Sequence, residues 1–293
     1  MRAEIERAVL LLRRGDEAAL DQALTLLQNT IFSFSMRVCG QREDAEDTMQ
    51  EVLLKSVPYL PKFDSPKALL VWLYKVAKNR CLMSRRRSKF APVQELSLEN
   101  LMPDREELQK LGTDDSINPE MFAIRSEEAG RVRKAIQQLP PQYRIVLVLR
   151  DMEGLADDEV GEITGLRPGT VRVRLHRARL FVREELMKTW KTRRGPVAKA
   201  MPSEEPRSIP RCKALFAELS NYLDEKLDDS MCDELERHLD GCAPCKTFLA
   251  TLEATIEGCR TSSVESLDRN RAVELRRKVL AEYEEMVTKN LSQ

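Results

Sequence analysis

Three residues near the end of the chain, His238, Cys242 and Cys245, have the spacing of metal ligands. Two residues separate the cysteines, a spacing that lets both thiolates bind one metal ion. Cys212, which lies 26 residues upstream of His238, belongs to the same constellation. The four residues predict one Zn²⁺ site per chain, which would hold together a helical unit with a small core.

Other chemistry is open to these cysteines. Cys242 and Cys245 could instead form a redox dithiol or stay as plain buried thiols. Two further cysteines compete for the fourth ligand position. Cys232 precedes His238 by six helical residues, which places it about 240° away around the helix, and Cys259 is a weaker candidate.

The cysteines and the apolar stretches of the sequence indicate in which cellular compartment the protein works. The seven cysteines are scattered, and nothing resembles a secretory signal. A reducing cytosol disfavours a disulfide framework, so Cys39 and Cys81 are interpreted as core residues. No apolar run approaches the roughly 18 residues that cross a bilayer. We therefore expect a cytoplasmic protein without membrane contact.

Residues 156–179 have the layout of a helix-turn-helix. Val160 and Ile163 form a short apolar face, Gly165 can take the left-handed conformation that ends a helix, and Thr170 lies where the next helix begins. An arginine-rich second helix suits the major groove, where arginine reads guanine edges or holds phosphates. The alternative is a solvated helix packed on its neighbours. The candidate DNA contacts are Arg167, Thr170, Arg172, Arg174, His176, Arg177 and Arg179.

Charge is segregated along the chain although the formal net charge is zero. Residues 67–89 hold eight basic residues and no acidic one, and residues 167–194 hold ten basic against two acidic. Acidic residues dominate 89–122, by eight to three, and 202–293, by nineteen to thirteen. The first basic stretch also contains Trp72, and this mixture of cations and aromatics is typical of a groove for single-stranded nucleic acid.

An acidic helix is expected over residues 44–52. Asp44, Asp47 and Glu51 would share one face of it, so that a basic partner surface could engage them together. An ordinary solvated helix face is the alternative.

Apolar residues recur every three or four positions over most of the chain, as in Leu20, Leu24, Leu27 and Ile31, and this period predicts an all-α protein. Clusters of proline and stretches without periodicity divide it. The expected order is a helical domain over 1–89, a flexible acidic linker over 90–119, a domain of four short helices over 120–191, a second linker over 192–211, a small zinc-binding module over 212–262 and a helical tail over 263–293.

Several of these segments resemble the small, extracytoplasmic-function sigma factors of bacterial transcription. Residues 139–150 and 169–179 are similar to the sigma domain that reads the upstream, minus thirty-five, promoter element. Residues 44–52 resemble the helix that grips the clamp of core RNA polymerase, and residues 72–79 resemble the strand-opening helix. Met83 departs from the pattern, because the family often has an aspartate there.

The resemblance implies two sets of site residues in the first domain. The polymerase-binding set is Asp44, Glu46, Asp47, Gln50 and Glu51. The set for the downstream promoter element, which includes a loop that captures a flipped base, is Lys62, Phe63, Asp64, Lys75, Lys78, Asn79, Arg80, Arg85 and Arg86. Trp72 could equally be a core residue or a DNA contact.

The cysteine-rich block resembles the zinc-containing anti-sigma domain, whose distant first ligand corresponds to Cys212. The sequence thus predicts a sigma factor for core RNA polymerase and promoter DNA, with a fused module that contacts the sigma domains and responds to metal or redox change. We expect the module to inhibit, with activation as the alternative.

Two rival functions belong to other classes. One is a conventional helix-turn-helix regulator that does not act as a sigma subunit, and the other is an anti-sigma-like or redox protein with a vestigial helix-turn-helix. An enzyme is not expected, because neither histidine has a nucleophile motif around it and no phosphate-binding glycine loop is present.

Overall fold

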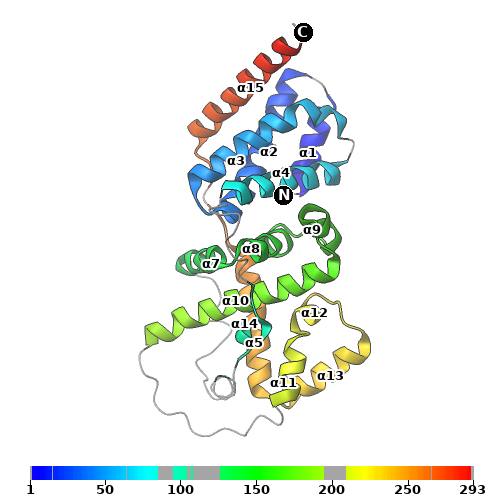
Figure 1. Ribbon diagram of the computed structural model, residues 1–293, viewed down its shortest axis with the longest axis vertical. Coiled ribbons are helices and arrows are strands. Elements are labelled where there is room, and N and C mark those ends of the chain that lie inside the picture. The colour runs from blue at the N-terminus through cyan, green and yellow to red at the C-terminus, as the bar shows by residue number, and fades with distance from the viewer. Residues whose placement is uncertain are drawn as a thin grey trace. The chain divides into compact units, whose positions relative to one another are not determined.

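The computed structural model describes residues 2–14, 16–63, 65–84, 95–103, 107, 126–194, 209–264 and 266–291. Every regular element in these described stretches is a helix, which confirms the predicted all-α class (Figure 1). The chain divides into two compact units. The first combines residues 1–92, 158–166 and 263–293, and the second combines residues 93–157 and 167–262.

The first unit is built on four helices from the start of the chain: α1 (Arg2–Leu12), α2 (Glu17–Cys39), α3 (Arg42–Ser56) and α4 (Pro66–Ser84). The helix α2 begins where the side chain of Asp16 accepts a hydrogen bond from the Ala19 amide at 2.7 Å. It ends at Gly40, whose φ of 79° is the left-handed conformation that glycine adopts without strain. Leu24, Leu27 and Ile31 are fully buried, as their period predicts.

Three further elements belong to the first unit. The short 3₁₀ helix η1 (Val57–Lys62) joins α3 to the loop before α4, and α9 (Asp157–Thr164) lies in this unit from its second residue onward. The last helix, α15 (Arg269–Leu291), packs against α2 and α3. Leu275 and Val279 are its buried apolar residues. The expected C-terminal tail is therefore part of the first unit's core.

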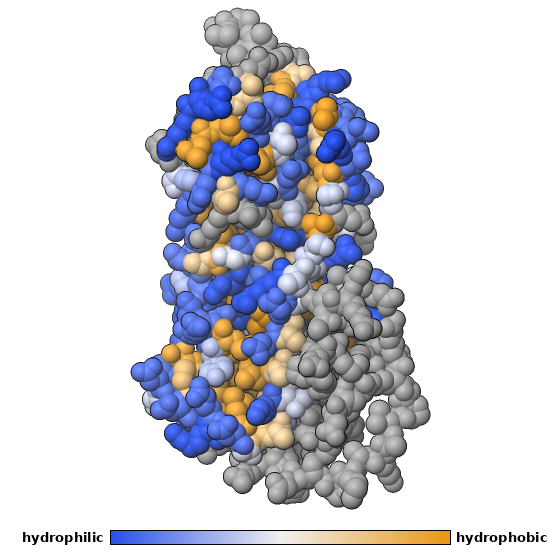
Figure 2. All heavy atoms as spheres, turned by 180° about the vertical axis from the view of Figure 1, so that it is seen from behind, coloured by the Kyte–Doolittle hydropathy of each residue, from blue (hydrophilic) through white to orange (hydrophobic). Residues whose placement is uncertain are grey.

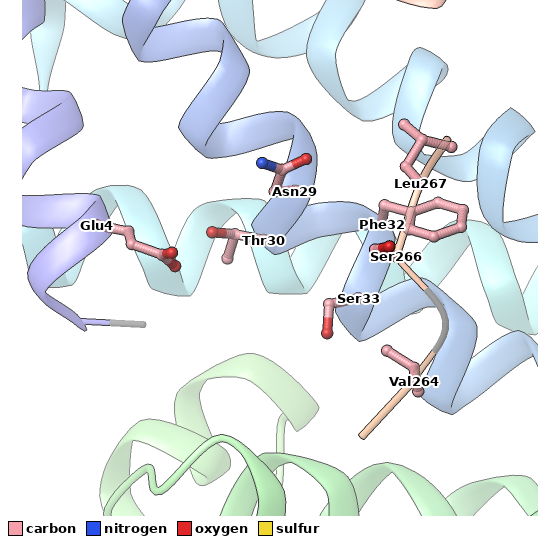
Figure 3. A pocket seen from close by; sticks show the side chains of 8 residues that line it. All are labelled: Glu4, Asn29, Thr30, Phe32, Ser33, Val264, Ser266 and Leu267. Atoms are coloured by element: carbon pink, nitrogen blue, oxygen red, sulfur yellow. The ribbon is translucent and has the colours of Figure 1, made fainter. Parts of the chain in front are cut away.

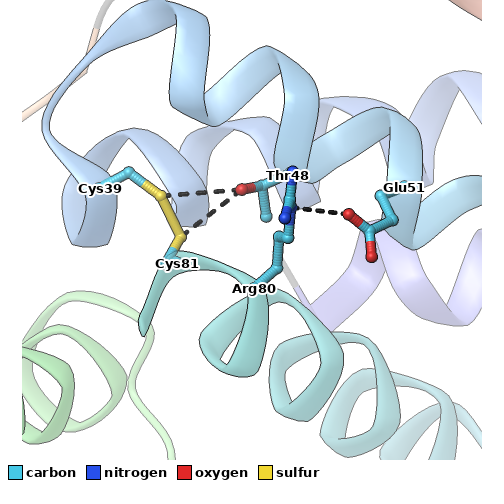
Figure 4. Close-up of a disulfide and its surroundings, with 5 residues drawn as sticks. All are labelled: Cys39, Thr48, Glu51, Arg80 and Cys81. Atoms are coloured by element: carbon cyan, nitrogen blue, oxygen red, sulfur yellow. Dashed lines mark hydrogen bonds and ion pairs between the residues drawn. A yellow bond between two sulfur atoms is a disulfide. The ribbon is translucent and has the colours of Figure 1, made fainter. Parts of the chain in front are cut away.

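A disulfide joins Cys39 at the end of α2 to Cys81 in the last turn of α4 (Figure 4). This corrects the expectation that the cysteines form no disulfide. Both residues are buried, as core residues should be, but their pairing spans 42 positions and could not be read from local spacing.

The second unit is organised around one long helix, α10 (Pro168–Arg194). Against it pack α5 (Leu98–Leu101), α7 (Ser126–Gln138), α8 (Pro141–Leu147) and α14 (Ala243–Thr261). A π-helical turn, η3 (Val148–Met152), continues α8. Of the four short helices that the sequence predicted over residues 120–191, the last differs from the prediction, because α10 runs for 27 residues.

Part of the expected flexible linker is packed. Leu96 and Leu101 are buried, and the Leu96 amide donates a hydrogen bond to the Tyr143 hydroxyl at 3.1 Å. Two leucines in a mostly acidic stretch were enough to dock the short helix α5 on α10, which corrects the linker prediction for residues 95–103.

The cysteine-rich module completes the second unit with α11 (Ile209–Phe216), α12 (Leu219–Leu223) and α13 (Asp229–Asp240), which precede α14. Phe216 and Phe248 stack in its small core with ring centroids 4.5 Å apart. Among the described residues, no helix has the length and apolar character to span a bilayer. Hydrophilic residues cover most of the visible described surface, and hydrophobic residues show through in separate patches (Figure 2).

Candidate functional site

The predicted metal ligands come together in the module. The ligand atoms of Cys212, His238, Cys242 and Cys245 all lie within 4.8 Å of one another. The His238 Nε2 atom is 3.5 Å from the Cys212 sulfur and 3.2 Å from the Cys245 sulfur, and the Cys242 and Cys245 sulfurs are 3.4 Å apart. Tetrahedral Zn²⁺ needs edges of about 3.6 to 3.8 Å. The four residues therefore fit a zinc ion.

Each ligand lies in a helix or caps one. Cys212 lies in α11 and His238 in the last turn of α13, while Cys242 caps α14 and Cys245 lies in its first turn. Gly241 ends α13 and allows the chain to turn between the histidine and the cysteine pair. Burial and the neighbouring thiols raise the pKa of Cys245, a cost that a bound cation offsets by stabilising the thiolate. Cys232 and Cys259 lie outside this group of four.

The module is docked on α10 through a buried charge network. Arg179 of α10 donates to both carboxylate oxygens of Asp151, at 2.9 and 2.6 Å, and to both oxygens of Asp224, at 2.9 Å each. The side chains of Arg179 and Asp151 are fully buried. Burial by itself lowers the pKa of the Arg179 guanidinium, but the two carboxylates outweigh it and raise that pKa. Asp224 follows α12, so this network ties the module to the helix-turn-helix region.

Two more side chains of α10 bind the module. His176 Nδ1 lies 2.8 Å from the Ser220 hydroxyl oxygen, and burial followed by the charge of Arg179 lowers the pKa of His176 to about 4. The guanidinium of Arg183 lies 3.7 Å from the centre of the Phe248 ring, and its Nε donates to the Thr251 hydroxyl at 2.8 Å. The neutral imidazole and the stacked guanidinium both belong to a packed interface.

The structure separates the predicted DNA contacts of α10 into two groups. His176 and Arg179 are buried against the module, so neither is available to DNA in this conformation, which corrects their placement on a DNA-facing surface. The sequence alone could not distinguish these two buried residues from the exposed basic residues of α10, because their partners lie 28 to 45 residues away. Arg167, Thr170 and Arg172 are exposed, and Arg174 and Arg177 are half-buried.

The turn before α10 depends on two glycines. Gly165 has a φ of 77°, which confirms the left-handed conformation expected of it. Gly161 was not singled out by sequence, yet a β-carbon there would lie 2.7 Å from the Leu166 carbonyl oxygen. The Gly165 and Leu166 amides both donate to the Gly161 carbonyl, at 2.8 and 3.1 Å. Close backbone approach is thus the reason for the second glycine.

The predicted polymerase-binding residues lie on α3. Asp47 is exposed, and Asp44 and Gln50 are half-buried. Glu51 is half-buried and pairs with Lys55 and Arg80, each at 2.6 Å. Glu46 differs from the others because it is buried.

The burial of Glu46 has a cause far along the chain. Its two carboxylate oxygens accept hydrogen bonds from Arg42 at 3.0 Å and from Arg271 of α15 at 2.9 Å. Arg276 of α15 pairs with Asp21 at 2.7 Å, and the Gln28 amide donates to the Ala272 carbonyl at 2.9 Å. The C-terminal helix therefore occupies part of the predicted polymerase-binding surface.

The predicted downstream-element residues surround the start and end of α4. Tyr59, Phe63 and Trp72 form an aromatic cluster with ring centroids 6.2 and 5.8 Å from that of the half-buried tryptophan. Exposed Lys62 lies 5.3 Å from the Tyr59 ring centre. This cluster combines a cation with aromatic faces, as single-strand binding requires.

At the other end of α4, Lys75 and Asn79 are exposed and Arg80 is engaged by Glu51. Lys78 donates to the Ile163 carbonyl at 2.8 Å, and burial followed by the charge of Lys75 lowers the pKa of Lys78. Three predicted contacts, Asp64, Arg85 and Arg86, lie outside the described residues.

A pocket of roughly 470 Å³ lies beneath the segment that leads into α15 (Figure 3). Phe32 of α2 and Leu267 lie close together at one end of it, and Glu4 of α1 lies at the other. Its mixed apolar and polar lining links the entry of α15 to the first two helices.

Comparison with known families gives three matches along the chain. Residues 24–90 match Sigma-70 region 2, residues 129–182 match Sigma-70 region 4, and residues 212–246 match a zinc-finger family described as putative. The first two regions contain α3, α4 and most of α10, and the third contains all four predicted metal ligands.

Similar whole proteins point the same way. The ECF RNA polymerase sigma factor SigW of Bacillus subtilis is 27% identical over 186 residues, which cover 64% of this chain and 98% of the relative. The RNA polymerase sigma-H factor of Pseudomonas aeruginosa is 31% identical over 171 residues, covering 57% of this chain and 86% of the relative. The ECF RNA polymerase sigma-E factor of Escherichia coli is 29% identical over 171 residues, with the same coverage.

Proposed function

Because this chain belongs to the extracytoplasmic-function family of RNA polymerase sigma factors, we propose that it is an initiation factor restrained in cis by its own zinc-binding module and C-terminal helix. Its partners are core RNA polymerase and promoter DNA. It would act in the cytoplasm, where both partners are found. The activity in transcription initiation is inferred from the family membership. The restraint in cis is inferred from the contacts of the C-terminal third of the chain.

The exposed residues define the proposed contacts. On α3, Asp47 and its half-buried neighbours would face a basic surface of the polymerase clamp. On α10, Arg167, Thr170 and Arg172 would meet the upstream promoter element. Around α4, the aromatic cluster with Lys62 and the exposed Asn79 would meet the downstream element as it opens.

The observation that carries restraint in cis is the pairing of Arg271 with Glu46. Glu46 belongs to the proposed polymerase-binding set, and its carboxylate is buried with one oxygen bonded to Arg271 of α15, so a basic clamp would have to displace that helix to reach it. Leu275 and Val279 hold α15 against the same unit by apolar burial. Polymerase and α15 therefore compete for one surface, which favours inhibition over activation.

Zinc would be a structural part of this device. Bound by Cys212, His238, Cys242 and Cys245, it would fix α11, α13 and α14 relative to one another. That arrangement presents Asp224 and its neighbours to α10. Loss of the ion would loosen the module and with it the start of the chain segment that leads to α15.

The test of restraint is core-polymerase affinity and run-off transcription by the full-length, zinc-loaded protein and an Arg271→Glu variant. Repulsion between the new carboxylate and Glu46 should release α15 and tighten polymerase binding several-fold. Arg277→Glu is the matched control, because Arg277 is exposed on the same helix. Equal affinity of all three proteins would refute restraint by α15.

The proposed contacts have their own tests. Changing Asp47 and Glu51 together to lysine should abolish core-polymerase binding while leaving the helical fold intact. Arg172→Ala should lose about 1 to 3 kcal/mol at one promoter position if it reads a base, or weaken all sequences equally if it holds a phosphate. Unchanged binding to core enzyme in the first case, or to every promoter in the second, would refute the placement.

A further inference from the structure

We propose that Cys39 and Cys81 are a redox-modification site, a thiol pair that a peroxide converts to a reversible disulfide and that thereby locks the promoter-opening helix α4 in place. The inference rests on the proposed function in one respect, because it assumes that α4 contacts promoter DNA in a reducing compartment. None of the family matches assigns a role to either cysteine.

Cys39 and Cys81 meet where helices of the first unit come together. Cys39 is the last residue of α2, Cys81 lies in the last turn of α4, and their Cα atoms are 5.5 Å apart. The hydroxyl oxygen of Thr48, on α3, lies 3.8 Å from each sulfur (Figure 4). Three helices from separate parts of the first unit therefore converge on this one sulfur pair.

The cysteine pair would control the C-terminal end of α4. Arg80, which precedes Cys81, pairs with Glu51 of α3 at 2.6 Å (Figure 4). Asn79 is exposed one position further back. Anchoring Cys81 to α2 thus fixes the C-terminal end of α4, next to the proposed downstream contacts Asn79 and Arg80, against the helix that carries the proposed polymerase contacts.

The chemistry of a reducing compartment also favours a redox role for this cysteine pair. Disulfides in reducing compartments are usually transient and redox-sensing, since thiol reductants remove those that do not re-form. The pair differs from the other thiol-rich site of the chain, whose cysteines would be occupied by a metal ion. Both cysteines are buried, so oxidation requires a brief opening of the last turn of α4, where Met83 is already exposed.

The reaction balances with a peroxide as oxidant. One cysteine loses its proton, and its thiolate attacks a peroxide oxygen. The O–O bond breaks, the departing oxygen takes up a proton as water, and a sulfenic acid remains. The second sulfur then attacks the sulfenic sulfur, the S–S bond forms, and the S–O bond breaks to release a second water. Two thiols and one hydrogen peroxide give one disulfide and two waters, and a dithiol reductant reverses the change.

Oxidation should stabilise the first unit. The bond spans 42 positions of sequence, so it removes much of the freedom of the unfolded chain between α2 and α4. For a domain of this size we expect the melting temperature of the first unit to rise by about 10 °C on oxidation. Promoter opening by the oxidised protein should then persist at temperatures at which the reduced protein fails.

The experiment uses full-length, zinc-loaded protein treated with hydrogen peroxide or with a phosphine reductant. Differential alkylation and peptide mass mapping should find the peptides of Cys39 and Cys81 cross-linked only after peroxide, with a mass loss of two hydrogens. The melting temperature and promoter opening, followed by fluorescence of a base within the downstream element, are measured on the same samples. Cys39→Ser and Cys81→Ser should make both readouts insensitive to peroxide.

Cys259→Ser is the matched control, because Cys259 is also buried but lies in the second unit. It should respond to peroxide as the unmodified protein does. Alkylation of both Cys39 and Cys81 after peroxide treatment would overturn the inference, and so would a cross-link that changes neither melting temperature nor promoter opening. If a serine variant fails to fold, the peroxide response of the unmodified chain still decides the matter.

Failure here is distinguishable from failure of restraint in cis. The effect of Arg271→Glu on polymerase affinity is measured under reducing conditions, where Cys39 and Cys81 are thiols in every sample. A null result for the disulfide leaves that measurement untouched. Conversely, loss of all promoter-dependent transcription in both redox states would argue against the proposed function, whatever the state of the cysteines.

Discussion

The C-terminal third of the chain makes two contacts of different kind, one in each unit. In the second unit, the module meets α10 through Arg179, whose side chain is 0% exposed between two carboxylates. In the first unit, α15 meets α3 through Arg271, whose side chain is 41% exposed. The first contact is a fully buried charge network, whereas the second pairs a half-exposed arginine with the largely buried carboxylate of Glu46, which is 10% exposed, beside a narrow apolar strip.

This difference separates a lasting contact from a releasable one. Breaking the network around Arg179 leaves a buried charge without water or partner, whereas Arg271 is already partly hydrated and stays in water when α15 leaves. The module should therefore stay docked on α10 as a permanent layer of the second unit. Under the proposed restraint, the helix α15 would leave α3 when the basic surface of the polymerase binds there. The regulated step would then be the exposure of α3 rather than the uncovering of α10.

The largest expected effect comes from removing the zinc ion that we propose holds the module together. A chelator or Cys242→Ser should unfold α11 to α13, since structural zinc contributes about 10 to 16 kcal/mol of apparent binding free energy in small domains. Circular dichroism would report the lost helix, and hydrogen exchange would report the exposure of His176 and Arg179. Cys232→Ser, outside the ligand cluster, is the control. A fully protected α10 in metal-free protein would contradict the prediction.

The next effect is on the buried network itself. Arg179→Ala leaves the carboxylates of Asp151 and Asp224 without their cation and should destabilise the second unit by about 3 to 5 kcal/mol. Urea denaturation measures the change in free energy of unfolding. Arg174→Ala, on the same helix but half-buried, should cost much less. If the two variants are equally stable, the network does not anchor the module.

Docking of the module should also depend on pH through His176. Its pKa is about 4 in the docked state, below the ordinary value of 6.5, because burial and the charge of Arg179 disfavour the imidazolium. The neutral imidazole of His176 therefore makes its full contribution to the stability of the second unit above pH 6.5. This contribution is lost as the pH falls toward 4. At pH 5 the loss should be about 2 kcal/mol.

Denaturation of the second unit at pH 7 and pH 5 measures this dependence. His176→Gln is the control, because it keeps the other histidine, His238, whose own protonation would weaken a metal site. The difference between the unmodified protein and the variant isolates the contribution of His176. The same pH dependence in both proteins would rule out a titrating His176 at the docked interface.

The smallest effect is expected at the contact between α15 and α2. Arg276 pairs with the half-exposed carboxylate of Asp21, so Arg276→Ala should cost the first unit no more than about 1 kcal/mol, and less at high salt. Thermal unfolding at low and high ionic strength is the measurement. A salt-independent cost equal to that of Arg179→Ala would show that the two contacts are of one kind.

Local spacing predicted what depends on neighbours along the chain. The three-and-four period predicted helices because side chains on one helix face recur every 3.6 residues. The His238, Cys242 and Cys245 cluster and the left-handed Gly165 were found for the same reason, since each is defined within a stretch of eight residues or fewer. Cys212 was found only through family resemblance, because 26 residues separate it from His238.

Short-range geometry and family pattern encode the helical class, the two sigma regions and the metal-ligand spacing, so these could be predicted from the amino-acid sequence. The long-range partners depend on how the helices pack: Arg179 with Asp151 and Asp224, Arg271 with Glu46 across 225 positions, and Cys39 with Cys81. Residue type alone does not distinguish one arginine of α10 from another, and successive residues differ by only about 100° around a helix. Which of them meets a carboxylate and which meets water depends on the elements that pack against that helix.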